Sequence, residues 1–81
     1  MERQEIRVMV SEEGNAYFAS ADKNALLDLG DFLAEIFPDG EQEPVRWHKN
    51  KKENQLFVDR HLKPPKRDLE ALLAIYRSRK S

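Results

Sequence analysis

Two segments near the start of the chain have the alternation of apolar and polar residues that is typical of β-strands. In residues 4–10 the apolar positions on one side are Ile6, Val8 and Val10. Residues 16–20 form a second such segment, and the polar stretch between the two contains Gly14. Alternating segments joined by a polar turn with glycine predict a β-hairpin.

The length of that turn determines which side chains share a face of the sheet. We expect a turn with an even number of residues, which places Val10 on the same face as Tyr17 and Ala19. Met9 and Phe18 then share the opposite face. On this expectation the Phe18 ring points away from the core.

Residues 22–37 carry the longest helical pattern in the chain. Ser20 or Asp22 can cap this helix, because both side chains accept hydrogen bonds from backbone N–H groups at a helix start. Apolar residues then recur at helical spacing: Ala25, Leu26, Leu29, Phe32, Leu33, Ile36 and Phe37. This spacing predicts an amphipathic helix. Pro38 ends it and begins an acidic loop, residues 38–44.

The second half of the chain repeats the order of strand, strand and helix. Residues 45–48 and 55–60 predict a second hairpin around the polar turn 49–54. Its outward positions are Arg46, His48 and Phe57. Pro65 is expected at the first position of a final helix, where a missing N–H costs nothing. The buried stripe of that helix is Leu69, Leu72, Leu73 and Tyr76.

The order ββαββα predicts a single α+β domain over residues 1–81, with ββα units at 4–37 and 45–78 joined by the acidic loop. We expect a four-stranded, largely antiparallel sheet with two helices packed on one face. The predicted core sets Leu26, Leu29, Leu33, Phe37, Leu69, Leu72, Leu73 and Tyr76 against Ile6, Val8, Val10, Tyr17, Val45, Trp47, Leu56 and Val58. An offset of 39 residues aligns Arg7 with Arg46 and Phe18 with Phe57, which suggests a pseudo-twofold repeat of the ββα unit.

Composition argues against an enzyme or a metal protein. The 81 residues include no cysteine, so neither a disulfide nor a thiolate metal site can form. His48 and His61 lie 13 residues apart without a metal-binding signature, and the three glycines form no phosphate-binding loop. We therefore expect no catalytic residues, no metal and no cofactor. No signal peptide and no apolar run of about 20 residues is present, so we expect a cytoplasmic protein that does not enter membranes.

Charge is divided unevenly along the chain. Residues 1–40 contain three basic and nine acidic residues, a net charge of −6, whereas residues 41–81 contain eleven basic and six acidic residues, a net charge of +5. The total is only −1. This asymmetry suggests a charged partner for the second half of the chain.

Two sets of residues predict nucleic-acid binding, to single strands more than to duplexes. Outward aromatic rings can stack on bases, and neighbouring cations can neutralise phosphates. The residues that would do so on the outward sheet face are Arg7, Phe18, Arg46, His48 and Phe57. Those of the basic stretch are Lys49, Lys51, Lys52, Lys63, Lys66 and Arg67.

Each of these signals has a simpler interpretation. Large aromatic residues such as Phe18 and Phe57 are more often buried, and a lysine-rich turn is often only a solvated surface. The alternative function is a protein-interaction module, an adaptor, an inhibitor or a homodimer, that uses the oppositely charged halves. This alternative accounts more naturally for a pI near 6.1.

Overall fold

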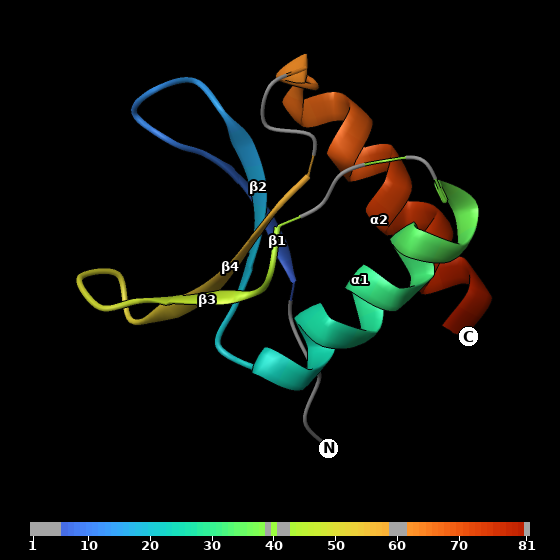
Figure 1. The fold of residues 1–81 in the computed structure, drawn as a ribbon, viewed down its shortest axis with the longest axis horizontal. Coiled ribbons are helices and arrows are strands. Elements are labelled where there is room, and N and C mark those ends of the chain that lie inside the picture. The colour runs from blue at the N-terminus through green and yellow to red at the C-terminus, as the bar shows by residue number, and fades with distance from the viewer. Residues whose placement is uncertain (1–5, 39, 41–42, 59–61, 81) are drawn as a thin grey trace.

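The chain runs through strand, strand and helix twice, as the sequence predicts. The computed structural model describes residues 6–38, 40, 43–58 and 62–80. Figure 1 shows the elements: β1 (Arg7–Val10), β2 (Ala16–Ser20), α1 (Lys23–Ile36), β3 (Arg46–His48), β4 (Glu53–Phe57) and α2 (Lys66–Lys80). The α+β class and the ββαββα order are therefore confirmed. The parts of the predicted strands and acidic loop at residues 4–5, 39, 41–42 and 59–60 lie outside the described residues.

The four strands form one antiparallel sheet in the order β1-β2-β4-β3. Both helices lie on the same face of this sheet (Figure 1). Helix α1 packs on the two central strands β2 and β4, and α2 packs on β1 and β2. One face of the sheet is thus covered by helices and the other is open, which is the predicted arrangement. The edge strand β3 lies beside the region that the helices cover.

A three-residue loop, Glu12–Gly14, joins β1 to β2 and fixes the register of the first hairpin. The Ser11 N–H donates to the Asn15 carbonyl at 2.8 Å, and the Gly14 N–H donates to the Ser11 carbonyl at 2.9 Å. Gly14 has φ +88°, a left-handed conformation that glycine adopts without steric cost. Three-residue hairpin loops place a glycine in this way. The expectation of an even-membered turn is therefore wrong.

Because the loop is odd, the two aromatic residues of β2 exchange the faces predicted for them. Val8 lies opposite Phe18, and Met9 lies opposite Tyr17. Phe18 also pairs with Leu56 of β4 on the helix-covered face and is completely buried there. Tyr17 is buried too, but on the open face and outside the main core cluster.

The core between sheet and helices contains most of the predicted residues. Its members are Ile6, Val8, Ala16, Phe18, Ala25, Leu26, Leu29, Phe32, Leu33, Leu56, Val58, Leu69, Leu73 and Tyr76. Three other predicted core residues are exposed instead, namely Val10 at 47%, Phe37 at 47% and Trp47 at 59%. Val10 ends its strand beside the loop, and Phe37 is the cap residue after the last turn of α1. Trp47 belongs to the edge strand outside the main helix contacts.

Polar contacts fix the helices in place. The Asp22 carboxylate accepts from the backbone N–H groups of Asn24 at 3.0 Å and Ala25 at 3.4 Å, which confirms it as the cap of α1. The Tyr76 hydroxyl of α2 donates to the Asp28 carboxylate of α1 at 2.5 Å. Burial, together with this hydrogen bond and the nearby negative charge, raises the pKa of Tyr76 to about 12.

The second hairpin has a different register from the first, so the aligned halves are not equivalent. Arg46 pairs with Gln55 across a four-residue loop, 49–52, whereas Arg7 pairs with Ala19. An offset of 39 residues would carry Ala19 to Val58 rather than to Gln55. As a result Phe18 lies in the core, while Phe57 lies on the open face. Helix α2 also begins one residue later than predicted, because Pro65 supplies the carbonyl that accepts from Asp68 and Leu69.

The two phenylalanines provide a test of this register. We expect Phe18→Ala to lower the free energy of unfolding by about 3–5 kcal/mol, because it leaves a cavity in the core. Phe57→Ala removes a partly exposed ring and should cost about 1–2 kcal/mol. Urea unfolding of both variants measures the difference. Equal costs would contradict the placement of Phe18 and Phe57 on opposite faces.

Candidate functional site

The open face of the sheet carries an aromatic pair at its centre. Tyr17 of β2 lies opposite Phe57 of β4, with ring centroids 4.8 Å apart and planes inclined by 30°. Phe57 is partly exposed, as predicted for an outward position, whereas Tyr17 is covered. The predicted stacking residue Phe18 lies in the core, so it is not part of this site. The residue that lies beside Phe57 on the open face is Tyr17 instead.

A buried carboxylate on this face, that of Glu53, contacts residues of three strands. It accepts from Arg7 of β1 at 3.1 Å, from the Tyr17 hydroxyl of β2 at 3.4 Å and from the Gln55 amide at 3.1 Å. The ammonium group of Lys51 lies 3.3 Å from the Tyr17 hydroxyl. Arg7 therefore pairs with an internal carboxylate, while 55% of its side-chain surface remains exposed. Sequence reasoning missed Glu53, because an acidic residue next to a lysine-rich turn resembles an ordinary surface residue.

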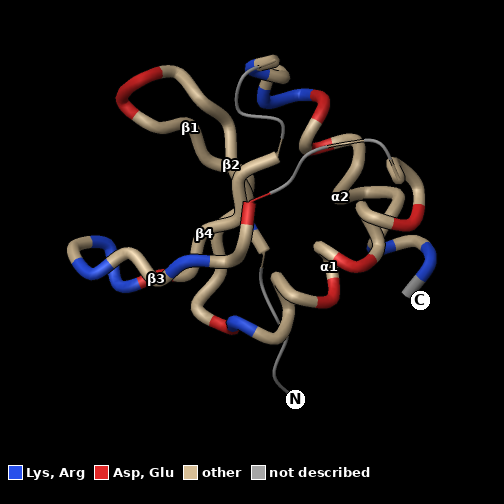
Figure 2. Tube along the Cα trace, in the orientation of Figure 1, with Lys and Arg blue, Asp and Glu red and all other residues tan. Residues whose placement is uncertain are grey.

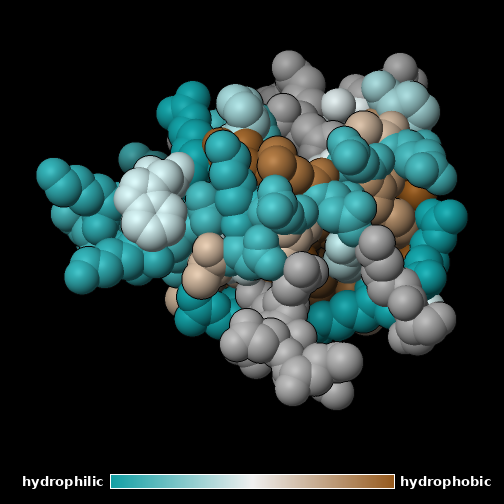
Figure 3. All heavy atoms as spheres, turned by 90° about the horizontal axis from the view of Figure 1, so that it is seen from below, coloured by the Kyte–Doolittle hydropathy of each residue, from teal (hydrophilic) through white to brown (hydrophobic). Residues whose placement is uncertain are grey.

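The hairpin formed by β3, the loop 49–52 and β4, which we call the basic hairpin, extends away from the helices (Figure 1). Residues 46–52 contain no acidic residue, and their four cationic side chains, Arg46, Lys49, Lys51 and Lys52, are exposed. No ion pair forms between any described acidic residue and Arg46, Lys49 or Lys52. The projecting end of the molecule is surrounded by hydrophilic side chains (Figure 3). This arrangement concentrates positive charge at one end of the protein.

Local backbone geometry shapes the tip of the basic hairpin. The Lys51 N–H donates to Nδ1 of His48 at 3.2 Å, so the imidazole helps to close the loop. Lys52 adopts φ 53°, a left-handed conformation that a side chain makes unfavourable. The predicted site residues His48, Lys49, Lys51 and Lys52 therefore lie together on one compact turn.

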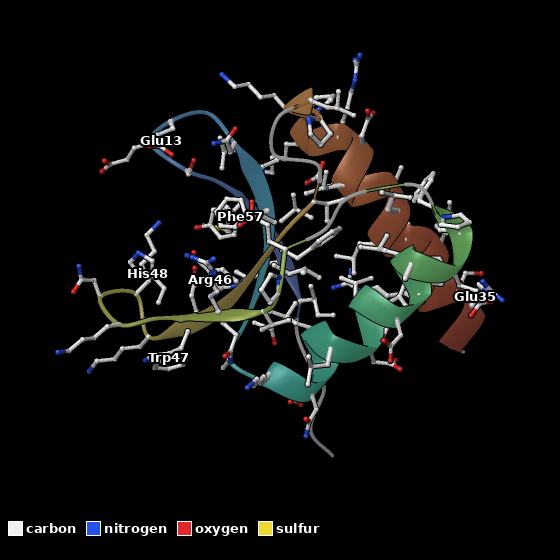
Figure 4. The ribbon with its side chains drawn as sticks, in the orientation of Figure 1. Glu13, Glu35, Arg46, Trp47, His48 and Phe57 are labelled. Carbon is white, nitrogen blue, oxygen red and sulfur yellow. The ribbon has the colours of Figure 1, made fainter. Side chains whose placement is uncertain are left out.

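Trp47 is the exposed aromatic residue that sequence reasoning placed in the core. It alternates with Arg46 and His48 along β3, and Figure 4 shows its side chain on the opposite side of the strand from theirs. With 59% of its surface exposed, it offers a wide aromatic face to solvent. One sequence signal for this exposure is the basic residues around it, Arg46 and Lys49, whereas its place on an edge strand follows only from the sheet order.

A hollow of about 630 Å³ lies between the tips of the two hairpins on the open face. We call it the inter-hairpin hollow. One wall is the acidic β1–β2 loop and the other is the basic hairpin, with the aromatic pair at the base. Its lining includes Glu12, Glu13, Arg46, His48, Lys51 and Phe57. Figure 4 shows Glu13 on one side, Arg46 and His48 on the other, and Phe57 between them.

The remaining predicted cations form a second, separate cluster. Lys63, Lys66 and Arg67 are exposed near the start of α2, and Lys66 lies 4.0 Å from Glu70 one turn later. Figure 2 shows the acidic β1–β2 loop between this cluster and the basic hairpin. The structure therefore divides the predicted basic stretch in two. The acidic residues Asp28, Asp31 and Glu35 lie on α1, away from the basic hairpin (Figure 2).

Comparisons with known proteins give no indication of the function. No protein-family model, no curated protein and no solved structure matches this chain. No helix among the described residues combines the length and apolar character needed to cross a bilayer. In the same part of the chain, no three His, Cys, Asp or Glu side chains group closely enough to hold a metal ion.

The Glu53 contacts predict a large effect from a single substitution. Glu53→Ala removes the acceptor shared by Arg7, Tyr17 and Gln55, which should lower the free energy of unfolding by about 1–3 kcal/mol. Glu12→Ala, an exposed control, should change it by less than about 0.5 kcal/mol. Denaturant unfolding measures both. If the two substitutions cost the same, Glu53 does not link the strands as described.

Proposed function

We propose that this protein binds single-stranded nucleic acid through the basic hairpin. The observation that carries the proposal is the exposed Trp47 among four exposed cations on a projecting turn. A single exposed apolar residue is common on a protein surface, but Trp47 lies on a hairpin that also carries four exposed cations. Exposed aromatic surface and positive charge on the same hairpin match a polymer that has aromatic bases and anionic phosphates.

The cations would contact the phosphate backbone. Arg46, Lys49 and Lys52 form no ion pair with any described acidic residue, so their charges are available to an anionic ligand. Each single-strand phosphate that they neutralise contributes about 0.7 to the slope of log K against log salt. Three such contacts give a slope of about −2, which describes a modest, salt-sensitive binder.

Trp47 would provide a stacking surface for an unpaired base. Base stacking on an aromatic side chain is worth about 1–3 kcal/mol and needs no particular sequence. In a duplex the base faces are already stacked on one another, so a projecting ring reaches them only in single strands. The proposal therefore favours single-stranded over double-stranded nucleic acid.

The low net charge is compatible with this function because much of the acidic charge lies on α1, away from the basic hairpin, although Glu12 and Glu13 face that hairpin across the inter-hairpin hollow. The acidic side chains of Asp31 and Glu35 lie on α1, and the basic hairpin projects on the other side of the sheet (Figures 2 and 4). Such a dipolar protein turns its basic end toward a polyanion. The proposal keeps the cytoplasmic location expected from the sequence.

Protein association is a second candidate, favoured by a different surface. A groove of about 380 Å³ between α1 and residues 43–45 is lined by Leu27, Ala34, Pro44 and Val45. Leu27 is 45% exposed there. A partner protein or a second copy would bury these apolar groups. This candidate requires no role for the basic hairpin, which distinguishes it from the first.

The proposal predicts a large loss of binding from substitutions in the basic hairpin and a small loss from matched substitutions near α2. Lys49→Gln with Lys52→Gln should weaken binding to a labelled single strand and reduce the salt slope by about 1.4. Lys63→Gln with Arg67→Gln makes the same charge change near α2 and should have a much smaller effect.

Trp47→Ala should weaken binding roughly 5- to 150-fold, because it removes the stacking surface. Leu62→Ala, which truncates another exposed apolar residue, should change binding little. Fluorescence anisotropy at several salt concentrations measures each variant.

Because Trp47 is the only tryptophan, its fluorescence in the unmodified protein also reports contact with a base. We expect quenching that saturates with added strand and reverses with added salt. Equal losses from the two charge pairs would contradict the basic hairpin as the site. Absence of binding at about 50 mM salt, together with salt-independent dimers in sedimentation, would favour the protein-association candidate.

A further inference from the structure

The inter-hairpin hollow has two walls of opposite charge, which a phosphate-binding surface alone does not explain. Glu12 and Glu13 line one wall, and Arg46, His48 and Lys51 line the other. Its volume of about 630 Å³ is within the range of about 300–1,000 Å³ that is usual for small-molecule sites. An occupant must therefore present an anionic group to one wall and hydrogen-bond donors to the other.

We propose that this hollow holds one nucleotide of the bound strand and selects a base with an exocyclic amino group. This inference rests on the proposed function. The phosphate of that nucleotide would lie against Arg46 and Lys51, on the wall that is continuous with the basic hairpin. Its base would then extend across the hollow toward the acidic loop.

The aromatic base of the hollow fits a flat ring. Phe57 is partly exposed, and its ring is held against Tyr17 with centroids 4.8 Å apart. Tyr17 is itself fixed by contacts from its hydroxyl group to Glu53 and Lys51. A ring positioned in this way offers a rigid stacking surface, so little side-chain freedom is lost when a base binds.

The acidic wall would determine which base is accepted. A glutamate carboxylate accepts a hydrogen bond from the N4 amino group of cytosine. Thymine has a carbonyl oxygen at the same position, which the carboxylates of Glu12 and Glu13 would repel. Both bases are pyrimidines of nearly equal size, so they stack similarly and differ mainly in this group. The expected preference is therefore for cytosine over thymine.

Binding of equal-length oligonucleotides of deoxycytidine and of deoxythymidine tests the inference. Near neutral pH the unmodified protein should bind the cytidine strand at least about fivefold more tightly. Glu12→Gln with Glu13→Gln should bring the ratio of the two affinities close to one, because an amide can donate to the thymine carbonyl. The ratio is the readout, since removing two negative charges strengthens binding to any strand.

A control pair of substitutions on α1 separates the effect of the acidic loop from the effect of total charge. Asp31→Asn with Glu35→Gln removes the same charge from α1, outside the hollow, and should leave the preference for cytidine unchanged. Equal binding of both strands by the unmodified protein would overturn the inference while the proposed function stands. Loss of the preference in the α1 control as well would also overturn it. If neither strand binds at low salt, the proposed function itself fails.

Discussion

The register of the first hairpin is the constraint on which the rest of the structure depends. Gly14 in a left-handed conformation closes a loop of three residues, and this odd number assigns every side chain of β2 to its face. Phe18 thereby enters the core beneath the helices, and Tyr17 faces the other way. A loop of two or four residues would reverse both faces of a central strand. The core and the open face are thus determined by the same turn.

The open face is stabilised by polar contacts, as is usual for a sheet that helices cover on only one side. Glu53 connects β1, β2 and β4 through Arg7 and Tyr17, and Lys51 extends the contacts into the loop of the basic hairpin. Arg7 and Tyr17 belong to the first hairpin and Glu53 belongs to the second, so these contacts join the two hairpins that border the inter-hairpin hollow. Its two walls have opposite charge because the sheet order places the acidic β1–β2 loop near the loop 49–52 of the basic hairpin.

Periodicity alone was sufficient for the element order, the α+β class and the helix packing. Helix α1 illustrates why, since its apolar spacing and the Asp22 cap are local features that do not depend on distant residues. The faces of β2 could not be predicted, because one residue more or less in a polar loop reverses them. Trp47 was misplaced for a different reason, since only the sheet order shows that β3 is an edge strand away from the helices. Arg46, His48 and Phe57 lie on the open face as predicted, although the short strands of this hairpin gave a weaker pattern than the first hairpin.

Charge shows the same contrast between chain order and structure. Along the sequence the basic residues form one stretch, yet the fold separates the basic hairpin from Lys63 and Arg67 by inserting the acidic loop between them (Figure 2). The division into an acidic and a basic half is kept only in part, because α1 lies away from the basic hairpin while Glu12 and Glu13 face it across the inter-hairpin hollow. Local charge at the tip of that hairpin, rather than net charge, is what a partner would meet.

The face assignment of β2 is tested most directly by nuclear Overhauser effects in the isotopically labelled protein. The account predicts contacts between the Tyr17 and Phe57 rings, and contacts from the Phe18 ring to Leu56 and to the methyl groups of α1. Contacts between the Phe18 and Phe57 rings, with Tyr17 directed toward α1, would contradict it. That result would move the aromatic pair off the open face and remove the base of the inter-hairpin hollow.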